Sequence, residues 1–181
     1  IQIPNAQTAS QTKCPTTAGG NTAVFNLRES DATVKNGQTG VHVKWFSDAA
    51  GTVEIANPNS YTNTTNPQTV YARVCNDLSP TVCSGVQPVT LTVRSSPPAP
   101  ILTVVNNCNG TSTITAKNAN EELISASELT WSNNASGNPI NVTTTASVSA
   151  IRTVNTCHSV SSVAVTPAPK NTPAEPVLSK V

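Results

Sequence analysis

The chain has 181 residues, of which 10% are charged and 3% are aromatic, and its formal net charge is +1. Lysine and arginine form no cluster, so the repeated phosphate contacts of a nucleic-acid-binding surface are not expected. No stretch approaches the 18 consecutive apolar residues of a membrane-spanning helix, so we predict neither a nucleic-acid partner nor a membrane span.

Composition predicts an all-β chain. Threonine and valine favour strands and asparagine, glycine and proline favour turns, whereas the strong helix formers are scarce. The first clear strand is 21–28, in which Ala23, Phe25 and Leu27 alternate inward. The segment 30–40 that follows has the composition of a loop.

Two longer strands should form the middle of a sheet. Residues 40–47 place Trp45 on the same face as two valines, and residues 69–76 alternate in the same way. Both apolar faces need a covering layer, which the strand at 21–28 can provide. A short edge strand is predicted at 53–55, and a strand at 86–94 closes the unit. This spacing of strands and turns is typical of a β-sandwich.

A proline-rich segment at 96–100 interrupts this pattern and is predicted to be a stiff linker. We therefore predict a first sandwich over 1–95 and a second, smaller one over 101–167. Residues 168–181 are expected to hold another linker and the first strand of a truncated further repeat, because Ala174–Leu178 echoes Pro98–Leu102, and we expect the chain to be a piece of a longer protein. The strands predicted in the second sandwich are 101–105, 112–116, 129–131, 140–144, 148–154 and 160–165.

Several segments carry a resemblance to a known family. In the first half these are the Val-Lys-Trp-Phe strand that ends at Phe46 and the run Tyr61–Val74, and in the second they are Val105–Ser112, Leu129–Asn133 and Thr153–Cys157. They resemble the immunoglobulin-like repeats of very large Bacteroidetes surface adhesins, a group that includes gliding-motility adhesins exported by the type IX system. The resemblance implies two tandem immunoglobulin-like antiparallel β-sandwiches at the cell surface, with no catalytic residues and no enzyme activity.

The five cysteines favour disulfides in an extracellular protein over a metal site. They form no C-x-x-C pair, and the two histidines do not lie at zinc-ligand spacing from them. Cys108 and Cys157 bracket the second sandwich and are predicted to pair. The resemblance implies that Cys14 pairs with Cys83 and leaves Cys75 unpaired, while a Cys75–Cys83 bridge across a hairpin stays open as an alternative.

Two further features are candidates for ligand contact. Phe46 follows the inward-facing Trp45 and should point outward, where an aromatic ring can contact a ligand unless a loop covers it. Carboxylates in or beside loops leave calcium open as a ligand, although no calcium-loop motif is present and no other cofactor is expected. These carboxylates are Asp31, Asp48, Glu54 and Asp77.

The function predicted from the sequence is that of a spacer in the repeat region of an adhesin, with neighbouring repeats of the same chain and a surface polysaccharide as partners. The alternative is a carbohydrate-binding or other ligand-binding module of a secreted enzyme. A glycan array separates these two hypotheses.

Overall fold

The computed structural model describes residues 2–171, so the predicted strand of a further repeat at 174–178 lies outside the described residues. The chain is all-β, with several small sheets and little helix. It divides into two compact units, Ile1–Ser95 and Ser96–Val181, which are described separately below. Among the described residues, no helix has the length and apolarity needed to cross a membrane.

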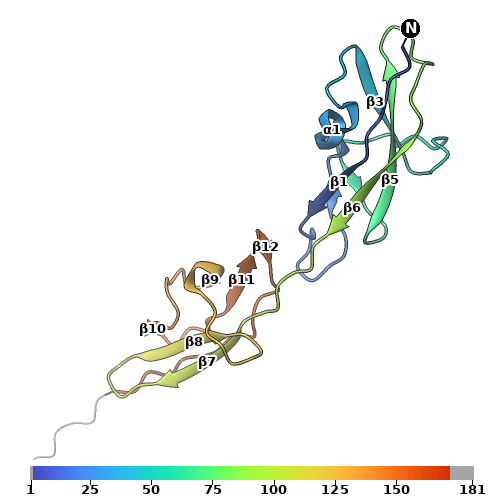
Figure 1. Cartoon of the computed structure of the whole chain (residues 1–181). Helices are drawn as coiled ribbons and strands as arrows, with labels where there is room; N and C mark the ends of the chain where they lie inside the picture. Colours follow the sequence, from blue (N-terminus) through green and yellow to red (C-terminus); the bar gives the residue numbers. More distant parts are fainter. Residues whose placement is uncertain (1, 172–181) are drawn as a thin grey trace, which may run out of the picture. The chain divides into compact units, whose positions relative to one another are not determined.

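Unit 1 is built on a four-stranded sheet with the order β1-β6-β5-β3 (Figure 1). Its strand β1 runs parallel to β6, and the other neighbours are antiparallel. A two-stranded sheet, β2-β4, supplies a second layer. The strands are β1 (Ala9–Lys13), β2 (Val24–Phe25), β3 (Val41–Phe46), β4 (Tyr61–Thr62), β5 (Gln68–Asn76) and β6 (Gln87–Val93).

The core of unit 1 lies between these layers, as the alternation of apolar residues along the predicted strands indicated. Trp45 of β3 is 1% exposed, and the alternate residues Val70, Ala72 and Val74 of β5 are fully buried. Phe25 of β2 is buried in the same cluster. The predicted covering of the central strands by this segment is therefore confirmed.

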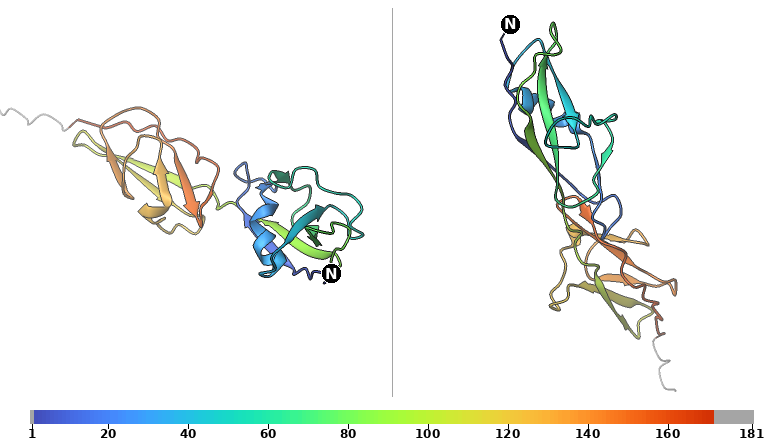
Figure 2. Two further views of the ribbon diagram at one scale, coloured as in Figure 1. Left: turned by 90° about the horizontal axis from the view of Figure 1, so that it is seen from above. Right: turned by 90° about the vertical axis from the view of Figure 1, so that its right-hand side faces the viewer.

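Residues 27–35 are helical, which the sequence-based prediction of a strand to 28 and then a loop missed. A 3-10 helix, η1 (Leu27–Ser30), leads into a one-turn helix, α1 (Asp31–Lys35), which packs against β3 and β5 (Figure 2). The Asn26 side chain accepts a hydrogen bond from the backbone of Arg28 and so caps the start. Val34 is fully buried. One apolar residue in a short polar segment is too weak a pattern to predict a helix.

A buried asparagine holds the turn between β4 and β5. Asn63 is 2% exposed, and its amide oxygen accepts a hydrogen bond from the Ala23 N–H at 2.7 Å. Its amide nitrogen donates to the carbonyl oxygens of Asn21 and Thr65, each at 2.9 Å. Nearby, the exposed Asn66 side chain bonds to both backbone groups of Val93 at 2.8 Å.

Unit 2 consists of two three-stranded sheets with the orders β10-β8-β7 and β12-β11-β9. Residues from both sheets share one core, in which Ile114 is fully buried and Trp131 is 2% exposed. The strands are β7 (Ile101–Asn106), β8 (Ser112–Lys117), β9 (Leu129–Trp131), β10 (Ile140–Val142), β11 (Ala150–Val154) and β12 (Cys157–His158), with a 3-10 helix, η2 (Ala126–Glu128), before β9.

Two predicted strands differ from the structure. The strand expected at 160–165 is limited to a bridge between Val165 and Val148, and 53–55 to a bridge between Glu54 and Phe46. Arg152, which shares the inward parity of its strand, is accommodated because its Nε donates to a Glu128 carboxylate oxygen at 2.7 Å. The polar partner removes the apparent conflict between charge and burial.

Candidate functional site

A disulfide joins the two arms of the hairpin between β5 and β6. Cys75 of β5 lies directly opposite Cys83, with their Cα atoms 4.1 Å apart. Because Cys83 is bonded to Cys75, the predicted Cys14–Cys83 bridge is wrong and Cys75 is not unpaired. The hairpin alternative is confirmed.

Hydrogen bonds hold the tip of this hairpin in one conformation. The Asn76 side chain accepts from the backbone N–H groups of Leu78 and Ser79 at 2.9 and 3.2 Å. At the base, the buried Ser84 hydroxyl accepts from the N–H of Val74 at 3.0 Å, and the Ser84 N–H donates to the Val74 carbonyl. The hairpin therefore presents Leu78, which is 94% exposed, on a well-ordered turn.

The remaining cysteines also differ from the prediction. Cys14 and Cys157 are both disulfide-bonded, whereas Cys108 is an exposed thiol. The predicted Cys108–Cys157 bridge is therefore wrong. Cys108 lies in the β7–β8 turn and Cys157 begins β12, and these two features lie at opposite ends of unit 2 (Figure 1). Cys14 directly follows β1 in unit 1.

Phe46 points away from the core face that holds Trp45, as alternation predicted, but it is only 6% exposed. The Arg73 guanidinium lies over its ring, 5.5 Å from the centroid, and Glu54 bridges to its backbone. The proposed contact of this ring with a ligand is therefore not possible in this structure. A loop and an arginine cover it instead.

Three of the four loop carboxylates considered for calcium have a protein partner, as follows. Asp31 accepts from the Trp45 indole N–H at 3.0 Å and pairs with Arg28, and Asp77 contacts His42 at 2.7 Å. Asp48 accepts hydrogen bonds from Val53 and Thr52. Within residues 2–171, no three metal-binding side chains lie close enough to share an ion.

Hydrogen bonding lowers the pKa of Asp48 below its ordinary value of 3.8. The largest contribution comes from the backbone N–H of Val53, followed by the Thr52 hydroxyl, and desolvation opposes them only in part. This carboxylate therefore stabilises the turn after β3, and its oxygens accept hydrogen bonds from residues of the same loop.

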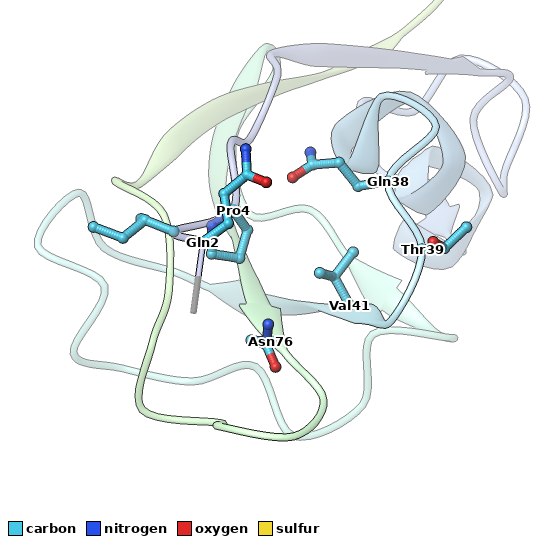
Figure 3. A pocket seen from close by; sticks show the side chains of 7 residues that line it. Gln2, Pro4, Gln38, Thr39, Val41 and Asn76 are labelled. Carbon is cyan, nitrogen blue, oxygen red and sulfur yellow. The ribbon is translucent and has the colours of Figure 1, made fainter.

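A hollow of about 340 Å³ lies beside the N-terminal segment of unit 1 (Figure 3). One of its side chains is fixed: the Gln38 amide exchanges two hydrogen bonds with the backbone of Asn5. Amide and hydroxyl groups predominate among its polar groups, so it suits a neutral polar group rather than an ion. The lining residues are Gln2, Ile3, Pro4, Gln38, Thr39, Val41 and Asn76.

Sequence reasoning missed this hollow and the His42–Asp77 contact beside it. The hollow forms where the N-terminal segment, β3 and the β5–β6 hairpin meet, and the His42–Asp77 contact joins β3 to that hairpin. The register that pairs His42 with Cys75 brings this histidine to the base of the disulfide hairpin. No spacing in the sequence indicates that contact.

These features define a class of protein: a β-sandwich-like, disulfide-stabilised chain made of two units. Residues 10–98, which include most of unit 1, match the family model of the Flavobacterium inter-domain disulphide bond domain. The match indicates a protein of the Bacteroidetes, in agreement with the origin that the sequence motifs implied. No curated protein matches the chain.

Proposed function

We propose that the chain is a spacer in the repeat region of an extracellular bacterial surface adhesin, and that its role is structural and adhesive rather than catalytic. The motifs that resemble gliding-motility adhesin repeats support this, and the match of residues 10–98 agrees with the Bacteroidetes origin that these motifs imply. Disulfides are typical of oxidising compartments outside the cytoplasm, which supports an extracellular location at the cell surface.

We further propose that both units are immunoglobulin-like. Each unit has a strand that carries a buried tryptophan, Trp45 on β3 and Trp131 on β9, as immunoglobulin sandwiches do. In unit 2 the sheets β10-β8-β7 and β12-β11-β9 correspond to six strands of a seven-stranded sandwich, and its fourth strand, D, has no counterpart among the described strands. In unit 1 the order β6-β5-β3 matches one of those sheets, and β1 extends it.

The observation that carries the proposal is the state of the five cysteines. Cys75 bonds Cys83, Cys108 is a thiol, and Cys14 and Cys157 are each disulfide-bonded. Elimination within the chain leaves these last two as partners. The family that matches unit 1 is described by an inter-domain disulphide bond. We infer that Cys14 and Cys157 form such a bond between the two units.

Such a bond has a mechanical consequence. Tension applied at the two ends of the chain would enter at Cys14, cross the disulfide and leave at Cys157. The 142 residues between these two cysteines would then carry none of it. Since an extended chain spans up to about 3.6 Å per residue, the bond would keep about 500 Å of chain out of the path of the force. An adhesin spacer with this bond stays short under load.

Non-reducing proteolysis with mass spectrometry tests the pairing. We expect one linked peptide pair that contains Cys14 and Cys157, and a second link between Cys75 and Cys83. A Cys14 peptide joined to any other cysteine would overturn the inter-unit bond.

Single-molecule pulling from the two ends tests the role. Replacing Cys14 and Cys157 by serine should lengthen the fully stretched chain by about 500 Å relative to the oxidised protein. The matched control replaces Cys75 and Cys83 by serine. Both cysteines lie inside the loop that the Cys14–Cys157 bond closes, so this variant should keep the stretched length of the oxidised protein. Equal lengths for the oxidised chain and the Cys14/Cys157 variant would refute the proposal.

The alternative function, a carbohydrate-binding module of a secreted enzyme, now depends on the hollow in Figure 3 rather than on Phe46. Its amide groups can bond sugar hydroxyls. A glycan array with the whole chain separates the two functions, because a spacer binds no restricted set of glycans. Loss of any array signal in a Gln2→Ala variant would assign the binding to the hollow.

A further inference from the structure

Strand β7 is an edge strand with an open side. Within residues 2–171 its only neighbour in the sheet is β8, where Leu102 lies opposite Ala116. The backbone N–H and C=O of Ala116 both bond the Asn138 side chain, on the side away from β7. Leu102, its partner in the register, must therefore point its own backbone groups away from β8, and Val104 does the same two residues later.

The side chains of β7 do not protect this edge. The strand holds no charge, no proline and no bulge, and its outward side chains include Ile101 and Val105, which are 46% and 61% exposed. Proteins usually protect exposed edges with charges, with proline or with very short strands. Uncharged, partly apolar and six residues long, β7 is suited to pairing with another strand.

The edge strands β3, β10 and β12 show the usual protection. The edge strand β3 carries Lys44 and is covered along its end by hydrogen bonds from the segment 53–55. Strands β10 and β12 have three and two residues. The open stretch of β7 ends at Asn106 and Asn107, which bond the segment 168–170.

We propose that β7 pairs with β7 of a second copy of this chain, antiparallel and about a two-fold axis at Thr103. In this register Leu102 of one copy faces Val104 of the other. Both residues already point their backbone groups outward, so the two pairs exchange N–H···O bonds without any change in the monomer. Ile101 then lies opposite Val105 of the other copy, in the position where side chains approach most closely.

A second copy is the occupant that the charges favour. Self-pairing would bring like charges together on a charged strand, but here it costs nothing because the strand is neutral. Pairing along one two-fold axis also closes after two copies, because each copy offers this edge once. The result is one six-stranded sheet with the order β10-β8-β7-β7-β8-β10. The contact area is small, so the dimer is expected to be weak and to depend on concentration.

Sedimentation velocity and amide hydrogen exchange of the oxidised chain, from about 10 µM to about 1 mM, test this. We expect a monomer–dimer equilibrium, with exchange at the Leu102 and Val104 amides slowing as concentration rises. The Thr103 amide, which faces β8, should not change. Thr103→Lys places two positive charges at the axis and should weaken the dimer at least tenfold.

The matched control is Thr90→Lys, another exposed strand threonine, in unit 1, which should dimerise like the parent chain. Hydrogen exchange of β8 checks that unit 2 of the Thr103→Lys variant is folded, and exchange of β5 does the same for unit 1 of the Thr90→Lys variant. A monomer at every concentration would overturn the proposal, and so would a dimer that Thr103→Lys does not affect. Protection of the Leu102 and Val104 amides that does not depend on concentration would show that the chain itself covers the edge, which also contradicts the proposal.

Discussion

Two asparagines in the turn between β4 and β5 should contribute differently to the stability of unit 1, and the difference follows from burial. Replacing Asn63 by alanine removes the partner of the Ala23 N–H, which is buried, and of two carbonyl oxygens. A buried backbone group that loses its partner costs about 1–3 kcal/mol, and the carbonyls of the exposed residues Asn21 and Thr65 can bind water instead. We therefore expect Asn63→Ala to lower the free energy of unfolding by about 2–3 kcal/mol.

Asn66→Ala is the control, because it removes the same side chain three residues later. It also breaks two hydrogen bonds, both to Val93, but Asn66 is exposed and water can replace its amide. The expected loss is about 0.5–1 kcal/mol. Urea unfolding can follow unit 1 through the fluorescence of Trp45, with Trp131→Phe as the common background of all variants.

For a unit of this size, a slope of about 1–2 kcal/mol per molar urea predicts that Asn63→Ala lowers the midpoint by about 1–3 M. The Asn66→Ala midpoint should fall by less than half as much. Equal losses for the two variants, or a loss below about 1 kcal/mol for Asn63→Ala, would show that burial of the amide does not decide its contribution.

Three further predictions concern single residues. Thiol alkylation of the denatured, unreduced chain should modify Cys108 and leave Cys75 unmodified, as peptide mapping will show. Gly51→Ala should lower the free energy of unfolding of unit 1 by about 1–3 kcal/mol, measured by urea unfolding. Gly51 has φ +67°, and a Cβ there would lie 2.8 Å from the Arg73 guanidinium. Gly110→Ala is the control and should lower the free energy of unfolding by less, because Gly110 has φ +80° but open space around it. NMR titration should give Asp48 a pKa below 3.8. Its contribution to stability is then present above pH 3.8 and is lost as the pH falls through the lowered pKa, and Asp48→Asn should remove that part of the acid dependence.

The strands could be predicted from the sequence wherever apolar and polar residues alternate over many positions. Trp45 and the valines of β5 follow a period of two over several residues, and only one face of that pattern can be buried. Residues 27–35 lacked such a pattern. Their helix depends on the Asn26 cap and on the burial of Val34, and tertiary packing decides both.

The site was harder to predict than the fold. Parity placed Phe46 outside the core, and this was correct, but parity gives no information on the Arg73 side chain that covers the ring. The Cys75–Cys83 bridge was within reach of sequence reasoning, since eight residues with a turn between them can form a hairpin. The resemblance favoured the wrong partner for Cys83, because the position of a cysteine along a repeat does not fix the direction of its side chain.

The pairing of Cys14 changes the role that the proline-rich segment 96–100 can have. With one disulfide inside each unit, as the sequence suggested, tension would pass from one unit to the next through this segment, and its stiffness would set the length of the spacer. With Cys14 joined to Cys157 as we propose, the segment lies inside the closed loop and carries no tension. Its prolines then limit only the relative orientations that the two units can adopt while the disulfide forms.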